Sequence, residues 1–192
     1  MTEIVIFHHI QGLTSGVHAF ADRLRAAGHT VHTPDSFEGR TFASIDEGEA
    51  YCSEIGFQAI RDRGVAQVQD LSANVVYGGF SLGVMAAQTL TQTRPGARAL
   101  LAYHGFADPT SFGTWPDGTP VQIHAMDADP YFVGEGDLEP AQAFVDAHTE
   151  AELFLYPGDG HLFADNTLDD YDAGATDLLV ERSLELLGRL DD

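Results

Sequence analysis

Short apolar runs alternate along the chain with stretches of helical periodicity. The apolar runs, rich in β-branched and aromatic side chains, predict strands at Ile4–Phe7, Thr30–Thr33, Asn74–Tyr77, Ala99–His104, Val121–Met126 and Glu152–Tyr156. Apolar residues at helical spacing predict helices at Gly16–Ala27, Ser44–Gly56, Phe57–Asp70, Ser81–Thr93, Leu138–His148 and Tyr171–Leu190. This alternation is typical of an α/β fold, here a mostly parallel sheet of about six to seven strands with helices on both faces.

The sequence contains no repeat, low-complexity tract or linker, so we expect a single domain over residues 1–192. Two long connections, Asp35–Ala43 and Gly105–Pro120, contain glycine, proline and aromatic residues. Long connections of this kind often carry function, and we expect them to lie over a binding site.

Charge and composition exclude several kinds of partner. The formal net charge is −21 and all nine basic residues are arginine, which argues against nucleic acid or an anionic membrane surface as a partner. The single cysteine, Cys52, excludes an internal disulfide and is predicted to be a packed thiol on a helix. The first residues enter a strand without a basic segment or a long apolar run, and we therefore expect a cytoplasmic protein.

The segment Gly79–Gly83, with the sequence Gly-Phe-Ser-Leu-Gly, carries the first candidate for chemistry. It follows an apolar strand and precedes an alanine-rich helix, which is the context of a serine nucleophile in a tight strand-to-helix turn. Glycines on either side of Ser81 give the backbones room to approach, and the Leu82 N–H at the helix start is placed to stabilise an oxyanion. The alternative is an ordinary βα turn in which a serine caps the helix.

A serine nucleophile requires a base, and the base requires an acid that fixes its tautomer. Asp127 and Asp129 follow the predicted strand at Val121–Met126, and His161 follows the strand at Glu152–Tyr156. The order Ser, Asp, His is that of α/β-hydrolases, and the carboxyl ends of parallel strands meet at one edge of the sheet. The pattern favours a catalytic triad over turn-forming aspartates and a solvated loop histidine.

The chain resembles the dienelactone hydrolase family of α/β-hydrolases over essentially its whole length. Four segments carry the resemblance: Phe7–Leu13, Gly79–Gly83, Ile123–Asp129 and Tyr156–Phe163. The resemblance implies the α/β-hydrolase fold and hydrolysis of an ester or lactone without a cofactor. It also identifies Asp129 rather than Asp127 as the triad acid, and it matches the backbone N–H of Ile10 to the second oxyanion donor.

The sequence departs from the family at the nucleophile and at the charged residues around it. Founding members have a cysteine where this chain has Ser81, so His161 must deprotonate a hydroxyl. They have a glutamate where this chain has His9, and a substrate-binding arginine at the position of Asp165. Arg40 lies near the position of another arginine but does not match it. Anionic lactones are therefore not the expected substrates.

We expect Ser81 to be the nucleophile, His161 the base and then the acid, and Asp129 the residue that holds His161. The pocket walls are expected from His9, Arg40, Phe106, Trp115 and Tyr131, and the substrate is expected to be a small neutral ester. No metal site is predicted, because His8 and His9 are adjacent on a strand and point to opposite faces. The alternatives are a non-catalytic binding protein on the same fold and a flavodoxin-like nucleotide-binding domain.

Overall fold

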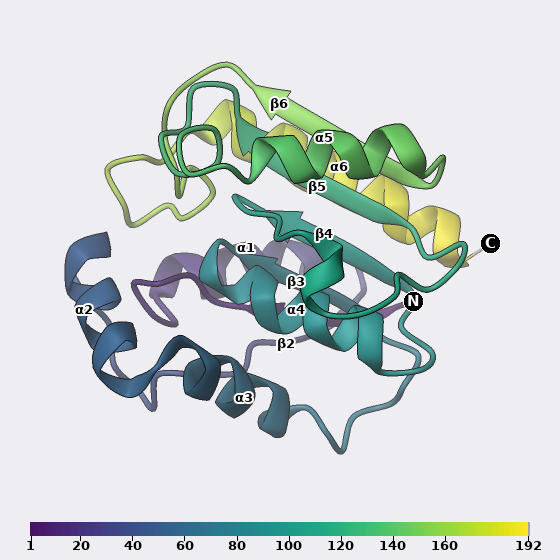
Figure 1. Ribbon diagram of the computed structural model, residues 1–192, viewed down its shortest axis with the longest axis horizontal. Coiled ribbons are helices and arrows are strands. Elements are labelled where there is room, and N and C mark those ends of the chain that lie inside the picture. The colour runs from purple at the N-terminus through teal and green to yellow at the C-terminus, as the bar shows by residue number, and fades with distance from the viewer. Residues whose placement is uncertain (192) are drawn as a thin grey trace.

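A computed structural model describes residues 1–191 of the chain. Its centre is a six-stranded sheet with the order β2-β1-β3-β4-β5-β6, in which every neighbouring pair is parallel (Figure 1). The strands are β1 (Glu3–Phe7), β2 (Thr30–His32), β3 (Val76–Phe80), β4 (Ala99–Tyr103), β5 (Val121–Met126) and β6 (Ala151–Tyr156). The predicted α/β class and parallel sheet are confirmed.

Helices cover both faces of the sheet, as the continuous apolar strands predict. The helices are α1 (Ser15–Ala26), α2 (Ile45–Ile55), α3 (Phe57–Gln67), α4 (Leu82–Thr93), α5 (Leu138–Ala147) and α6 (Ala173–Asp191), with a short 3₁₀ helix, η1 (Pro109–Ser111). α1 and α6 pack on one face of the sheet, and α3, α4 and α5 lie on the other. The two apolar cores come from alternate residues of the same strands, such as Ile4 and Ile6 on one face and Val5 and Phe7 on the other.

The main difference from the sequence prediction is the position of β3. The strand is displaced toward the C-terminus and includes Gly78 and also Gly79, which was expected to belong to the turn. A Cβ atom on Gly78 would lie 2.7 Å from Cδ1 of Ile6 on the neighbouring strand, so glycine serves here to let that side chain pack across β3. The turn is consequently shorter than the pattern suggested, and α4 begins at Leu82.

The strands share one direction, so their carboxyl ends meet at a single edge of the sheet. In Figure 1 this edge faces the side on which α2 lies, and the loops after β3, β5 and β6 converge there. α2 packs on α3 through a separate small core of Phe37, Tyr51, Cys52 and Ile60. No helix within residues 1–191 combines the length and the apolar composition needed to cross a membrane.

Candidate active site

Ser81 occupies a strained turn between β3 and α4. Its φ of 47° and ψ of −112° lie outside the regions that L-residues normally adopt, and its N–H donates to the carbonyl of Tyr103 at 2.7 Å. A Cβ on Gly79 would lie 2.4 Å from the backbone of Gly83, and a Cβ on Gly83 would lie 2.5 Å from the carbonyl oxygen of Phe7. Glycine is therefore required on both sides of Ser81 because the backbones of β3, α4 and β1 nearly touch.

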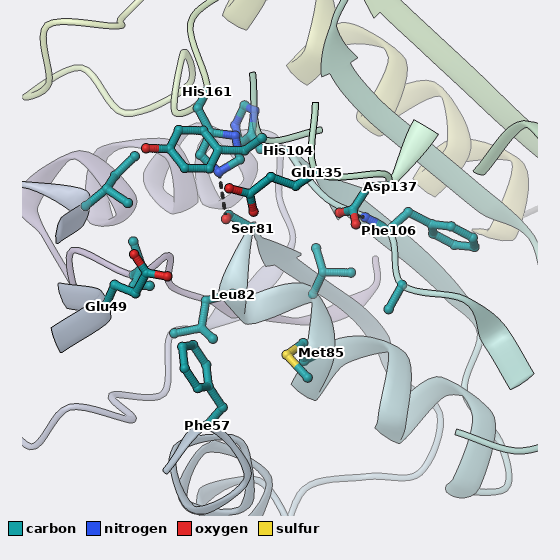
Figure 2. A pocket seen from close by; sticks show the side chains of 15 residues that line it. Glu49, Phe57, Ser81, Leu82, Met85, His104, Phe106, Glu135, Asp137 and His161 are labelled. Atoms are coloured by element: carbon teal, nitrogen blue, oxygen red, sulfur yellow. Dashed lines mark hydrogen bonds between the residues drawn. The ribbon is translucent and has the colours of Figure 1, made fainter. Parts of the chain in front are cut away.

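Ser81, His161 and Asp129 form a continuous chain of hydrogen bonds. Ser81 Oγ lies 2.8 Å from His161 Nε2, as the dashed line in Figure 2 shows, and His161 Nδ1 lies 2.8 Å from Oδ2 of Asp129. Asp129 is fully buried, and its Oδ1 accepts the N–H of Tyr131 at 2.8 Å. The carboxylate holds the proton on Nδ1, so the lone pair of Nε2 faces the hydroxyl, which donates to it.

Asp127 has a different environment from Asp129. It is exposed, and its Oδ1 accepts the N–H of Gly158 at 3.0 Å, which ties the loop after β5 to the loop that carries His161. Asp170 supports the same histidine loop, because its Oδ2 accepts the N–H of His161 at 3.1 Å. Asp170 was not among the predicted site residues, since an aspartate in a polar loop carries no local signal.

Two backbone N–H groups lie near the serine without an acceptor. The N–H groups of Leu82 and Ile10 donate to no protein acceptor among residues 1–191, and both residues line the cavity that contains Ser81. Leu82 is the first residue of α4, where the N–H groups of a helix lack partners within the helix. The positive end of the helix dipole adds to the attraction that these donors exert on a negative oxygen.

His9 and Asp165 form a buried pair beneath the loop that carries Ile10. His9 Nε2 donates to Asp165 Oδ2 at 2.9 Å, and His9 Nδ1 accepts the N–H of Gln11 at 3.2 Å. Burial alone would raise the pKa of Asp165, but hydrogen bonds from His9, Thr14 and Thr167 lower that pKa well below its usual value. Neither residue lines the cavity: His9 is 1% exposed and Asp165 is 3% exposed.

This placement changes how Asp165 relates to the substrate. From its position in the sequence, Asp165 was expected to face the substrate in place of an arginine. The side chain instead points into the protein, where it links the β1–α1 loop to the loop after β6. It therefore acts on the site by holding His9, and not by contact with the substrate.

The cavity at Ser81 has a volume of about 270 Å³ and is open to solvent (Figure 2). Its lining residues are Ile10, Ile45, Glu49, Phe57, Ser81, Leu82, Val84, Met85, His104, Phe106, Ala107, Tyr131, Glu135, Asp137 and His161. Of the five residues expected in the pocket walls, Phe106 and Tyr131 line this cavity, whereas His9, Arg40 and Trp115 do not. The Arg40 guanidinium lies 5.4 Å from the ring centroid of Tyr51, and the Trp115 indole N–H donates to the carbonyl of Thr119.

Much of the cavity wall comes from residues that the sequence analysis did not name. Ile45 and Glu49 come from α2, Phe57 begins α3, and Glu135 and Asp137 come from the loop between β5 and α5. These residues carry no motif, and only the packing of α2 and α3 beside the strand ends brings them to the serine.

His104 is an unusual member of the cavity wall. It follows β4 with a positive φ of 62°, and among the described residues neither ring nitrogen has a hydrogen-bond partner although the residue is only 1% exposed. Its ring stacks on Phe80 and lies edge-on to Phe163. Burial, together with the neighbouring histidines, holds its pKa well below the usual value, so the ring is neutral.

Comparisons with known proteins give a family match and several structural neighbours. The model of the dienelactone hydrolase family matches residues 1–190, while a comparison with curated protein sequences gave no match. A candidate dienelactone hydrolase from Klebsiella pneumoniae subsp. pneumoniae MGH 78578 superposes with a TM-score of 0.77 at 15% identity, covering 98% of this chain and 87% of that one.

Two further solved structures share the fold. A dienelactone hydrolase-like promiscuous phosphotriesterase from metagenomic libraries has a TM-score of 0.71 at 19% identity, covering 99% of this chain and 87% of its own. Thermogutta terrifontis esterase 2, phosphoramylated by tabun, has a TM-score of 0.63 at 16% identity, covering 98% and 83%. At such identities the neighbours establish the α/β-hydrolase fold alone. The family match spans nearly the whole sequence and supports a hydrolase: the chain belongs to the dienelactone hydrolase family.

Proposed function

We propose that this protein hydrolyses small carboxylic esters or lactones through an acyl-enzyme on Ser81. The observation that carries the proposal is the hydrogen-bonded chain from Ser81 Oγ through His161 to the buried Asp129, with both bonds at 2.8 Å. Such a chain makes a hydroxyl nucleophilic at neutral pH, and it lies in a cavity of small-molecule size.

The reaction follows from the positions of these groups. Ser81 Oγ attacks the substrate carbonyl carbon as His161 Nε2 takes the hydroxyl proton. The N–H groups of Leu82 and Ile10 stabilise the negative oxygen of the tetrahedral intermediate. His161 returns the proton to the leaving alcohol. Water then attacks the acyl-enzyme as His161 takes its proton, and the histidine returns this proton to Ser81 Oγ as the acyl–Oγ bond breaks and the acid leaves. Asp129 keeps the imidazole in the required tautomer and stabilises its protonated form. No step needs a cofactor.

Two alternatives remain from other classes of protein. A non-catalytic binding protein could retain the fold, but a fully buried aspartate aligned with His161 and Ser81 favours catalysis. A flavodoxin-like nucleotide-binding domain would need a phosphate-binding loop after β1. Here that loop contains the buried His9, which is paired with Asp165 from the loop after β6, and family membership also argues against this function.

The test combines covalent labelling with a substrate screen. A fluorophosphonate probe should label the wild-type protein on Ser81, and p-nitrophenyl esters and simple lactones should be hydrolysed. Ser81→Ala should abolish labelling and lower kcat by several orders of magnitude, up to about a millionfold by analogy with serine proteases. If the wild-type protein neither reacts with the probe nor hydrolyses any ester, the catalytic proposal is wrong.

Cys52 provides the control for the identity of the nucleophile. It is buried on α2, outside the cavity, and burial raises the pKa of its thiol to about 11, which leaves it protonated and unreactive. Iodoacetamide should leave activity unchanged. Loss of activity on alkylation, with no serine labelling, would move the nucleophile away from Ser81.

A further inference from the structure

The peptide group between His9 and Ile10 carries one of the two donors proposed for the oxyanion, and its carbonyl is held from the other side. The carbonyl oxygen of His9 accepts the N–H of Gly12 at 3.0 Å, which closes a turn over residues 9–12. The same oxygen lies 2.7 Å from Nδ1 of His8. This peptide is trans, so its C=O and N–H bonds point in opposite directions. Bonds that fix the carbonyl therefore also fix the direction of the Ile10 N–H.

The contacts of His8 allow one form of its ring. His8 directly follows β1 and is 2% exposed. Its Nε2 accepts the N–H of Ser36 at 3.0 Å, and its Nδ1 faces the His9 carbonyl, which can only accept. Burial lowers the pKa of His8 to about 4, so the ring is neutral at pH 7. The imidazole must therefore carry its proton on Nδ1 and donate it to the carbonyl of His9.

The nearest acidic group does not compete for this ring. Oδ1 of Asp35 lies 3.7 Å from Nε2 of His8, which is too far for a hydrogen bond, and it accepts the N–H of Phe37 at 2.8 Å. Phe37 also lies edge-on to the imidazole, with 4.7 Å between the ring centroids. The ring is thus held in place by an aromatic neighbour and by two backbone groups.

The next peptide of the turn is held by other residues. The N–H of Gln11 donates to Nδ1 of His9, and the carbonyl of Ile10 lies against α2, where a Cβ on Gly48 would collide with it. Among residues 1–191, however, His8 alone places a side-chain donor on the carbonyl of the peptide that carries the Ile10 N–H. Hydrogen bonds in a buried chain also polarise one another, so this donor should strengthen the N–H on the opposite side of the peptide.

We propose that His8 is a positioning residue for ester hydrolysis, whose Nδ1–H orients and polarises the His9–Ile10 peptide so that the Ile10 N–H faces the oxyanion. This inference rests on the proposed acyl transfer to Ser81 and adds to it a residue that lies outside the cavity. Loss of the His8 donor should weaken the stabilisation of the transition state and leave substrate binding nearly the same. The effect is therefore expected on kcat rather than on KM.

Two substitutions separate the two hydrogen bonds of the ring. The amide nitrogen in His8→Asn is bonded to Cγ, as Nδ1 is, so it can still donate to the His9 carbonyl, but nothing replaces Nε2. The amide oxygen in His8→Gln can reach the position of Nε2 and accept the Ser36 N–H, but no donor remains at the position of Nδ1. On a neutral p-nitrophenyl ester, His8→Gln should lower kcat by about 10- to 100-fold with less than about a threefold change in KM. His8→Asn should keep kcat within about fivefold of the wild-type value.

Urea denaturation separates this role from a purely structural one. Each variant loses one buried hydrogen bond, so both should unfold at similarly lowered urea concentrations, although His8→Gln alone loses most of its activity. His124→Gln is the control for loss of a buried histidine, because His124 is 0% exposed and lies outside the cavity. It should lower the urea midpoint and leave kcat unchanged. If kcat follows stability across the three variants and not the presence of the donor, the inference is wrong.

A trifluoromethyl ketone inhibitor reports on the oxyanion site directly. Ser81 Oγ adds to its carbonyl carbon, the hydroxyl proton passes to His161, and the ketone oxygen becomes the oxyanion. The inhibition constant should rise in His8→Gln by about the factor by which kcat/KM falls. Ile10→Pro removes the N–H itself, at a turn position that proline favours, and His8→Gln should have little further effect in that background. If the two substitutions lower kcat/KM independently, His8 does not act through Ile10.

The tautomer of His8 can be measured in the wild-type protein, where it does not depend on the folding of any variant. Nitrogen-15 NMR of the assigned His8 ring at pH 7 should show the proton on Nδ1, and a proton on Nε2 would overturn the inference. If the wild-type protein hydrolyses neutral esters and is labelled on Ser81, but His8→Gln retains full kcat, the role of His8 fails while the serine hydrolase stands. If the wild-type protein neither hydrolyses an ester nor reacts with the fluorophosphonate probe, the proposed function itself fails.

Discussion

Asp127 and Asp129 are chemically identical and two residues apart, yet the fold gives them different environments. Asp129 has no exposed surface, and its oxygens accept hydrogen bonds from His161 and Tyr131. Asp127 is exposed and accepts one backbone N–H from Gly158. A buried carboxylate is costly without partners, so the partners of Asp129 fix both its own position and that of the imidazole.

The two aspartates should therefore differ in their effect on catalysis. Asp129→Asn should lower kcat on the order of 10⁴-fold, because an amide cannot hold the proton on His161 Nδ1 in the same way. Asp127→Asn should cost less than about tenfold, because it alters only the support of a surface loop. Steady-state kinetics on one neutral ester decide the ranking, and the reverse order would assign the acid to Asp127.

The sequence could identify the candidate chemical groups because each directly follows a predicted strand. Ser81, Asp129 and His161 belong to loops whose position is set by the parallel sheet. The residues that shape the cavity could not be found in this way. Glu49 and Asp137 reach Ser81 only through the packing of α2 and of the β5–α5 loop, which depends on contacts between segments far apart in the chain.

At the scale of whole elements, Asp165 joins two loops that carry parts of the site. Its oxygens accept hydrogen bonds from His9 and Thr14 in the β1–α1 loop and from Thr167 in its own loop. Thr14 is also the N-cap of α1, where its hydroxyl accepts the N–H of Val17. A single buried carboxylate thus connects β1, the start of α1 and the loop that precedes α6.

Removal of this carboxylate should destabilise the protein strongly. Asp165→Ala leaves His9 and Thr14 without their buried acceptor, and the free energy of unfolding should fall by about 3–5 kcal/mol. Asp169→Ala, at an exposed position of the same loop, should change it by less than about 0.5 kcal/mol. Urea denaturation of both variants measures the difference. Equal stabilities would show that Asp165 does not hold these loops together.

Two helical glycines should respond in opposite ways to substitution by alanine, because only one of them lies in a tight contact. Gly83→Ala would place a Cβ 2.5 Å from the carbonyl oxygen of Phe7. This oxygen belongs to the backbone of β1, which cannot move away from the new methyl group as a flexible side chain could. The substitution should destabilise the protein by about 1–3 kcal/mol or more and reduce activity. Gly188→Ala, on α6 with nothing within 4 Å of the added Cβ, should stabilise the protein by about 0.5–1 kcal/mol. Thermal unfolding tests both signs, and a stabilising Gly83→Ala would contradict the tight contact.

The elements themselves followed largely from periodicity, because buried parallel strands are continuous apolar runs. The strand before Ser81 was predicted too early since glycines usually indicate a turn, whereas Gly78 belongs to β3 and makes room for Ile6. The sequence pattern indicates the structural preference of each residue, but it does not show that a glycine is needed to make room for a side chain on a neighbouring strand.

For the molecule as a whole, burial of neutral histidines links stability to pH. Burial lowers the pKa of His8 to about 4 and that of His124 to about 3, and it holds the pKa of His104 well below the usual value. All three are 2% exposed or less. In the unfolded chain these side chains would take up protons near pH 6.5, so acid favours the unfolded state.

The lowered pKa values of these histidines determine how stability changes with pH and over which pH range. A folded-state pKa below the unfolded one gives stability that is complete above pH 6.5 and is lost as the pH falls toward the folded pKa. Between about pH 6 and 4, each such histidine should contribute a slope of up to about 1.4 kcal/mol per pH unit. Asp137, whose pKa burial raises, acts in the opposite direction as a single group.

Urea denaturation at pH 7 and pH 5, at one high salt concentration that screens the excess negative charge, should therefore show a free energy of unfolding that is several kcal/mol lower at pH 5. His124→Gln should reduce the slope, because it removes a group that titrates in the unfolded state alone over this range. His18→Gln, at an exposed position on α1, is the matched control and should leave the slope unchanged. A free energy of unfolding that stays constant between pH 7 and 5 would mean that the buried histidines bind protons equally in both states, and the linkage derived from their burial would then be wrong.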